Sequence, residues 1–182
     1  MNDESDVAAP GRLDLVRSFV NTVDYPSGPD ELATVEGASA WASAHGLPAV
    51  SNQAECDRLR GLREALRDVL FANNGEGDAA GAWEALRPYA GDVRLGLTLD
   101  PHTGPQLQAA GIGADRIVAT LLGIVYDAVL DQTWPRLRAC RKATCRFAYY
   151  DRSKNASRAW CSMATCGNQE KAHRRRLRDR TL

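Results

Sequence analysis

Four cysteines near the carboxyl end restrict how this chain can fold more than any other feature of its sequence. Cys140 and Cys145 are separated by four residues, and Cys161 and Cys166 repeat that spacing after a 15-residue spacer. Two such pairs are typical of a tetrahedral zinc site, because each pair can place two thiolates on one metal. We therefore expect these four cysteines to hold one Zn²⁺ ion.

A site filled by four protein ligands leaves no open position for water or substrate, so this zinc is expected to be structural. Two disulfides or four unconnected cysteines are the alternatives, and His173 could replace Cys166 as a ligand. Clustered cysteines in a reducing compartment are more often metal ligands. Cys56 differs from the other four, because it lies beside Leu59 on an apolar helix face and is expected to be a buried free thiol.

The sequence between the cysteine pairs predicts a small hairpin. Residues 146–150 are strand-like, residues 151–155 are turn-like, and residues 158–160 lead back to the second pair. Residues 167–178 predict a helix with few apolar residues. A module this small depends on metal binding for much of its folding free energy. The aromatic residues expected to form its core are Phe147, Tyr149 or Tyr150, and Trp160.

Charge divides the chain into two parts. Residues 135–182 contain 14 Lys and Arg against 3 Asp and Glu, a net charge of +11. Residues 1–134 contain 9 basic and 20 acidic residues, a net charge of −11. The basic end is expected to bind polyanions, and the acidic part is expected to avoid them.

Nucleic acid, and DNA in particular, is the polyanion that the basic end is expected to contact. Arginine suits both phosphates and guanine edges, and a basic helix beside a rigid zinc site fits a groove. RNA is an alternative, in which Tyr149, Tyr150 and Trp160 stack on bases. Docking of the basic end on the acidic part, within one chain or across a dimer, is another. The candidate nucleic-acid-binding residues are Arg152, Lys154, Arg158, Asn168, Gln169, Lys171, Arg174, Arg175 and Arg178.

Helical periodicity dominates the acidic part of the chain. The helix with the strongest sequence pattern begins after Asn52, which can cap it, and has Glu55 three residues after the cap. It ends at residues 73–75. The helix at residues 114–130 is apolar around most of its girth and is expected to lie at the centre of the core. The remaining helices are predicted at residues 13–23, 30–44 and 78–89.

One segment has the period of a strand. Val93, Leu95, Leu97 and Leu99 alternate with polar residues, which predicts a strand with one buried face. Its partner is expected at residues 106–110, so that the two form a small hairpin.

These patterns predict a mainly α protein with a small β-hairpin (α+β), followed by a four-cysteine zinc module of knuckle, β-hairpin and basic helix. We place a flexible tail at residues 1–10, a mostly helical domain at 11–134 and the zinc module at 135–182. The most apolar run, residues 117–130, is too short and too interrupted to span a membrane. The amino terminus lacks the pattern of a secretory signal, so a cytoplasmic location is expected.

The cysteine-rich segment is similar to a known family. Residues 158–168 read RAWCSMATCGN and residues 150–155 read YDRSKN, and both resemble the CGNR zinc-finger proteins. In that family the finger follows an amino-terminal region called the ABATE domain, whose opening motif resembles residues 13–22. The resemblance covers nearly the whole chain and is strongest in the finger.

The resemblance implies a transcription regulator, often described as stress-related, with zinc on the four cysteines. Gln169 stands where the family has the arginine of its name, which is the one departure that matters. The zinc ligands are untouched, but a contact expected from that arginine would be missing or moved to Lys171 or Arg174. Glutamine can still read adenine.

A regulator needs an input, and the helical domain is expected either to sense a small molecule or to form a homodimer. Asn21, Thr22 and Trp41 are the candidate ligand-binding residues, with a capping or helix-ending role as the alternative for the two polar ones. No Ser-His-Asp order, phosphate loop or paired-carboxylate pattern is present, so the chain is not expected to be an enzyme.

Overall fold

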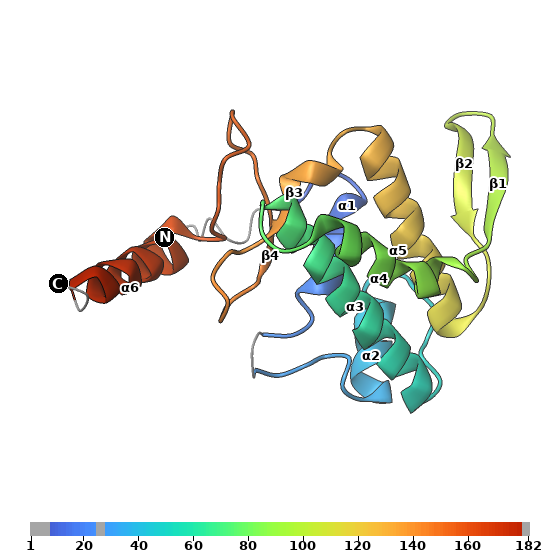
Figure 1. Ribbon diagram of the computed structural model, residues 1–182. Helices are drawn as coiled ribbons and strands as arrows, with labels where there is room; N and C mark the ends of the chain where they lie inside the picture. Colours follow the sequence, from blue (N-terminus) through green and yellow to red (C-terminus); the bar gives the residue numbers. More distant parts are fainter. Residues whose placement is uncertain (1–7, 25–27, 180–182) are drawn as a thin grey trace.

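The computed structural model describes residues 8–24 and 28–179 (Figure 1). That part of the chain is mainly helical with two small antiparallel strand pairs, which confirms the predicted fold class. The helices are α1 (Leu13–Val20), α2 (Val35–Ala44), α3 (Gln53–Asn73), α4 (Ala79–Ala90), α5 (Gly113–Leu130) and α6 (Asn168–Asp179). The strands are β1 (Leu95–Asp100), β2 (Gly104–Ala109), β3 (Leu137–Ala139) and β4 (Ala148–Tyr150).

Helix α3 forms the axis of the molecule, and α1, α2, α4, α5 and β3 all contact it (Figure 1). It begins as the sequence predicts, because the Asn52 side chain accepts a hydrogen bond from the Glu55 amide at 3.0 Å. The Glu55 carboxylate accepts one in turn from the Ser51 amide at 2.8 Å. Its apolar face and that of α5 are buried against each other and against α1, so α5 lies in the core as expected.

Two helix boundaries differ from the sequence prediction. Helix α1 ends at Val20, and α2 begins only after Thr34, whose side chain caps it. Asp30, the expected start of α2, instead pairs with Arg63 of α3, with Nη1–Oδ1 and Nη2–Oδ2 distances of 2.6 and 2.9 Å. Burial alone would raise the pKa of Asp30, but the hydrogen bonds from Arg63 and the Leu32 amide outweigh it and hold that pKa below its usual value.

The hydrophobic core continues past residue 134 into the cysteine-rich segment. Leu137, Ala139 and Ala148 are fully buried in the same core as the helices, on the antiparallel pair β3–β4. The first part of the zinc module is thus built onto α3. Of the predicted tail, residues 1–7 lie outside the described part, while Ala9 is buried and its amide donates to Asp14.

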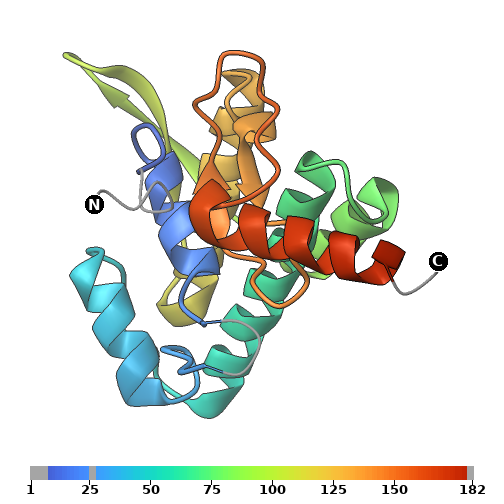
Figure 2. The ribbon, with the colours of Figure 1, turned by 90° about the vertical axis from the view of Figure 1, so that its left-hand side faces the viewer.

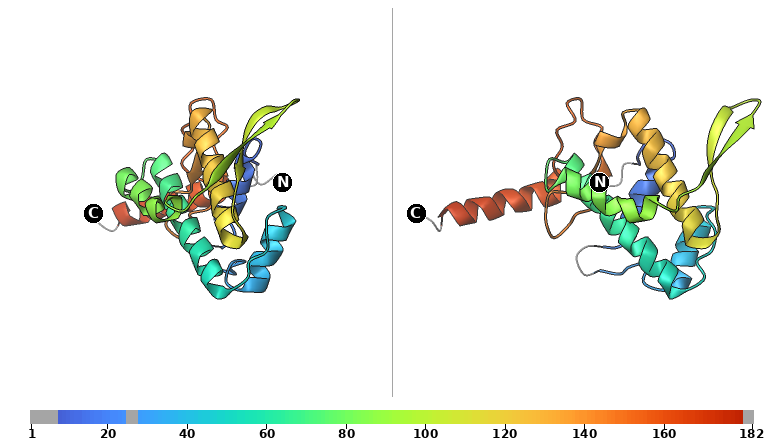
Figure 3. Two further views of the ribbon diagram at one scale, coloured as in Figure 1. Left: turned by 90° about the vertical axis from the view of Figure 1, so that its right-hand side faces the viewer. Right: turned by 45° about the vertical axis from the view of Figure 1, so that its right-hand side comes forward.

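The β1–β2 hairpin forms where the alternation predicts it, but the predicted burial of one face is wrong. Leu97 and Leu99 are exposed, and the hairpin projects from the body of the molecule (Figure 3). The alternation correctly places these leucines on one face. Burial requires something to cover that face. Helix α5 packs against the base of the hairpin, where Leu95 lies at Gly123 and β2 also contacts the helix, but Leu97 and Leu99 stay exposed.

The hairpin of the zinc module also differs from the prediction. Strand β4 pairs with residues 137–139, which precede the first cysteine pair, and not with residues 158–160. The return segment is held to the pair by single contacts: the Arg141 amide donates to Ala159 O at 3.2 Å, and the Tyr149 hydroxyl donates to Arg158 O at 2.5 Å. The reason is that residues 137–139 are apolar enough to join the main core.

Candidate metal centre and basic surface

The four cysteines predicted to bind zinc meet at one point. Their Sγ atoms all lie within 4.8 Å of one another, and the Cys145–Cys161 and Cys161–Cys166 distances are 3.6 and 3.7 Å. A tetrahedral zinc with Zn–S bonds of about 2.3 Å separates its sulfurs by about 3.8 Å. The cluster therefore fits one zinc ion bound by all four cysteines, and none of them forms a disulfide.

Tight turns present each cysteine pair. Cys140 follows β3 and its amide donates to Phe147 O at 2.9 Å, while the Cys145 amide donates to Lys142 O at 2.9 Å. Arg146 has a φ of +49°, which reverses the chain directly after the first pair. Cys166 lies in a π-helical turn, Met163–Gly167, that leads straight into α6.

Electrostatics explains why the four thiols need a cation. Hydrogen bonds from Cys145 and Cys161 lower the pKa of Cys140 to about 2. The bond to Cys140 raises the pKa of Cys145 to about 12, and it also raises the pKa of Cys161. One thiolate thus forms easily and holds protons on its neighbours, so four thiolates require a divalent ion among them. The protein binds one zinc, in a closed and structural site.

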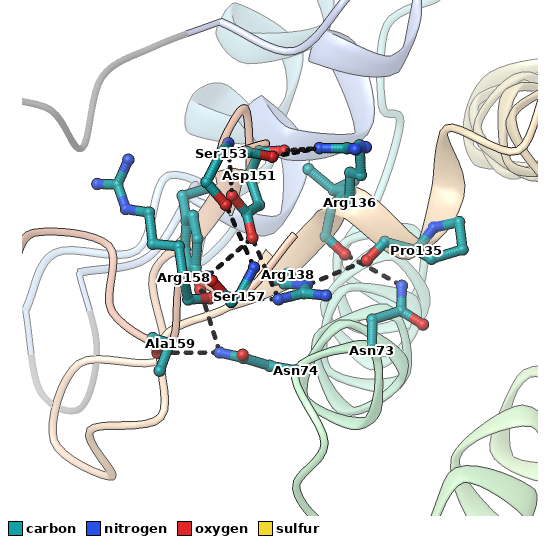
Figure 4. Close-up of polar contacts among 12 residues, drawn as sticks. Asn73, Asn74, Pro135, Arg136, Arg138, Asp151, Ser153, Ser157, Arg158 and Ala159 are labelled. Carbon is teal, nitrogen blue, oxygen red and sulfur yellow. Dashed lines mark hydrogen bonds and ion pairs between the residues drawn. The ribbon is translucent and has the colours of Figure 1, made fainter. Parts of the chain in front are cut away.

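Asn74, at the end of α3, ties the helical domain to both sides of the zinc module. Its Nδ2 lies 2.8 Å from Ala139 O, before the first cysteine pair, and 3.0 Å from Ala159 O, before the second (Figure 4). It also lies 3.2 Å from the Tyr149 hydroxyl. Asn74 is buried, so these hydrogen bonds do not compete with water. No local sequence pattern indicates this role, because an asparagine at a helix end normally signals only the end of the helix.

Charged contacts add to this junction. Arg141 pairs with Glu76 at 3.3 Å, and Arg146 pairs with Asp68 of α3 at 2.5 Å. Arg67 is fully buried and donates to Val20 O at 2.6 Å and to Arg146 O at 3.0 Å. The base of the basic module therefore docks on the acidic domain of its own chain.

Asp151 organises the loop between the cysteine pairs (Figure 4). This buried carboxylate accepts hydrogen bonds from the Ser153 amide at 2.9 Å, the Arg158 amide at 3.0 Å and Arg138 Nη1 at 3.2 Å. Burial alone would raise the pKa of Asp151, but these hydrogen bonds and the Arg138 charge outweigh it and keep the pKa below its usual value. The loop is thereby fixed without regular secondary structure.

Helix α6, which runs across the front of the view in Figure 2, carries most of its basic residues on one face. Lys171, Arg174, Arg175 and Arg178 follow the spacing i, i+3, i+4, i+7, which places them on one side. Arg176 points to the opposite side, where its Nε donates to Ala172 O. All of these side chains are exposed.

The other candidate nucleic-acid residues have different surroundings. Arg158 points inward, donates to Trp160 O at 2.8 Å and to Cys161 O, and so supports the second cysteine pair. Arg152 and Lys154 are exposed on the loop. At the start of α6, Asn168 donates to Ala164 O at 3.2 Å, and Gln169 accepts from Lys142 Nζ.

The aromatic residues of the module belong to its interior. Tyr149 is buried with the cysteines, and Phe147 and Trp160 pack partly buried around them, as predicted. Tyr150 is buried in the main core. Burial removes Tyr149 and Tyr150 as stacking platforms for RNA bases.

Asn21, Thr22 and Trp41, the candidate ligand-binding residues, make contacts within the fold. Asn21 donates to the carbonyl of Ala148 at 2.9 Å and accepts from its amide at 2.8 Å, so it pairs with β4 as a strand would. Thr22 donates to Phe19 O at 2.8 Å, and the Trp41 and Phe19 rings lie 5.3 Å apart. A role for these three residues in binding an effector stays a prediction.

Two family models match this chain. One, described as "CGNR zinc finger", matches residues 136–179. The other, described as "ABATE: Putative stress-induced transcription regulator", matches residues 13–139. Neither describes an enzyme. A search of curated proteins finds no match.

No described helix combines the length and apolar character that crossing a membrane requires.

Proposed function

Since this chain belongs to the ABATE family and carries a CGNR zinc finger, we propose that it is a transcription regulator that binds double-stranded DNA through α6. The observation that carries the proposal is the exposed basic face of that helix, Lys171, Arg174, Arg175 and Arg178. The zinc takes no part in chemistry and serves as the anchor of the helix. We place this function in the cytoplasm.

The dimensions of α6 suit the major groove of DNA. A segment from residue 171 to 178 rises about 10 Å, and the groove is about 12 Å wide and accepts a helix. The body of the protein lies behind the amino-terminal end of α6, so the helix extends freely (Figure 1). The acidic domain would be repelled by phosphates, and this projection keeps it at a distance.

Zinc binding supplies the stability that a helix as short as α6 lacks by itself. An isolated helix of 12 residues is marginal in water, and α6 has no buried residue to stabilise it. Cys166 lies in the turn that runs into its first residue. The metal therefore fixes where α6 starts and in which direction it points.

Lys171 is our candidate for reading sequence. It is exposed in the first turn of α6 on the basic face, and the amino-terminal residues of recognition helices are those that contact base edges. Gln169 lies on the side of Arg176 and accepts from Lys142 Nζ, so the base contact expected at that position is assigned to Lys171. Lysine donates to the O6 and N7 atoms of guanine. Lys171→Gln is expected to lower affinity for guanine-containing selected sites more than affinity for random DNA, as measured by fluorescence anisotropy.

The salt dependence of DNA binding tests the proposal. Each phosphate contact contributes about −0.9 to the slope of log K against log salt, so Arg178→Gln should reduce the slope by about 1. Arg176→Gln is the matched control, because it removes the same charge from the opposite face of α6. Binding of random duplex DNA that does not depend on salt, or equal slopes for the two variants, would contradict the assignment.

Two outcomes of the same experiment favour the alternatives. Tighter binding of single-stranded RNA than of duplex DNA would point to an RNA-binding protein. If neither nucleic acid binds, the module is an interaction domain for acidic proteins, extending the docking already made by Arg141 and Arg146. The helical domain supplies the input, by binding an effector or by dimerising.

A further inference from the structure

The acidic domain carries an apolar surface that the described residues of the chain, 8–24 and 28–179, leave uncovered. On the hairpin, Leu97 and Leu99 are 67% and 78% exposed. On α5, Tyr126 and Leu130 are 54% and 63% exposed. Single exposed apolar residues are normal, but a large cluster of them marks an interaction site.

The hairpin presents these residues on one face. Leu95, Leu97 and Leu99 alternate along β1 and therefore share a side, and the Leu95 side chain lies against Gly123 of α5. The face thus turns toward α5 at its base and extends beyond it toward the tip (Figure 3). The residues opposite them on β2 are Ala109, Leu107 and Pro105, which are also apolar.

A groove between α4 and α5 forms the second half of the surface. It encloses about 380 Å³, and its only charged lining residue, Arg87, pairs with Glu84 at 3.0 Å. The apolar side chains that line it include Trp83, Leu86, Leu122, Val125, Tyr126 and Val129.

We propose that this surface joins two copies of the chain in a twofold-symmetric dimer, in which the hairpin face of each copy covers the α4–α5 groove of the other. One chain supplies both a projecting apolar arm and an apolar groove, which is the self-complementary pattern of such an interface. The surface is almost free of charge although the domain is strongly acidic, so two copies can meet there without repulsion.

The size of the surface fits a stable dimer. Eight large apolar residues are exposed on the hairpin, α4, α5 and the turn before α5. Trp83 and Tyr126, each about half exposed, offer about 100 Å² apiece, and the six aliphatic side chains bring the apolar area to several hundred Å² per copy, on the order of the 800 Å² of a standard interface. A two-stranded hairpin is also marginal by itself, so a partner that covers it explains its projection.

Molar mass measured by light scattering after gel filtration tests the dimer. The wild type is expected to be dimeric at micromolar concentration, and Leu97→Ser/Leu99→Ser is expected to be monomeric. Leu177→Ser is the matched control, because it removes an exposed leucine from α6, outside the surface, and should stay dimeric. The proposal does not depend on DNA binding, so its failure would leave the role of α6 standing.

A second variant tests the reciprocal arrangement. Tyr126→Arg alters the groove at an exposed position and should also give monomers. Mixed with the hairpin variant, it should form dimers again, because its intact hairpin meets an intact groove in the other copy. Circular dichroism and zinc content establish that each variant is folded. A monomeric wild type, dimers that persist in both variants, or a mixture that stays monomeric would overturn the proposal.

Discussion

The buried amide of Asn74 holds together segments that lie far apart in the chain. It links the end of α3 to the backbone before each cysteine pair, while the Asn74 carbonyl accepts from Arg141. A hydrogen bond in a buried position is costly to leave unmade. The stability of the zinc module therefore depends on a residue outside it.

Replacing Asn74 with aspartate tests this dependence. The carboxylate would face the carbonyl oxygens of Ala139 and Ala159 with no proton to donate, so Asn74→Asp is expected to lower the free energy of unfolding by about 2–3 kcal/mol. Asn155→Asp, at an exposed asparagine of the zinc module, should change it by less than about 0.5 kcal/mol. Urea unfolding measures both, and equal effects would show that the Asn74 contacts contribute nothing.

The Asp30–Arg63 pair predicts a pH dependence of stability. The folded-state pKa of Asp30 lies below its unfolded value of about 3.9. The pair therefore stabilises the fold fully above that unfolded value, and the contribution is lost as the pH falls through the lower folded value. At pH 7, Asp30→Asn should cost about 2–3 kcal/mol, because buried Arg63 loses two charge-assisted hydrogen bonds and keeps only the more exposed Glu64 as a charged partner.

The measurement is urea unfolding of wild type and Asp30→Asn between neutral and acidic pH. The difference in unfolding free energy should be constant above about pH 5 and shrink below it. A difference that does not change with pH would mean that the ionised carboxylate of Asp30 is not what stabilises the fold.

For single residues, the sequence predicts a structural role only where that role depends on the spacing to nearby residues. The cysteine pairs and the Asn52 cap depend on neighbours a few positions away. Asn74 and Arg67 act on partners from distant segments, and no local pattern indicates them. Their roles follow only from the way that β3 and β4 pack on α3.

Helices and strands were predicted correctly where their own sequence pattern determines the type of element. The helix periods and the β1 alternation specify the type of each element, because side chains repeat with the period of the backbone. The partner of β4 and the exposure of the hairpin depend on what lies beside them in space. Leu97 and Leu99 show this, because their alternation is typical of a strand with a covered face and no described residue of the chain covers them.

The start of α5 is constrained by its neighbour α3. Gly113 has a φ of +51°, and a Cβ there would lie 2.8 Å from the Glu55 carboxylate that caps α3. Gly113→Ala is therefore expected to destabilise the fold by about 1–2 kcal/mol. Gly91 has an ordinary helical conformation and open space around it, so Gly91→Ala should be neutral or slightly stabilising. Thermal unfolding of the two variants distinguishes them, and a neutral Gly113→Ala would contradict this view of the junction.

Taken whole, the molecule joins an acidic helical body to a basic helix through one shared core. Arg141 and Arg146 are used at the junction, whereas the basic face of α6 stays exposed. Strands β3 and β4 pack in the core of the helical body, and the turn that carries Cys166 runs directly into α6. A change in the body can therefore alter how α6 is held. In the proposed function, that connection links an input in the helical body to DNA binding by α6.

The central claim is that zinc orders α6 for DNA binding. The most direct test measures zinc content and affinity for random duplex DNA on one sample before and after chelation. We predict one zinc per chain, and a loss of affinity of about tenfold or more on its removal, since a short helix without its anchor is marginal. Added zinc should restore binding. A metal-free protein that binds DNA as tightly as the zinc-loaded form would contradict the account.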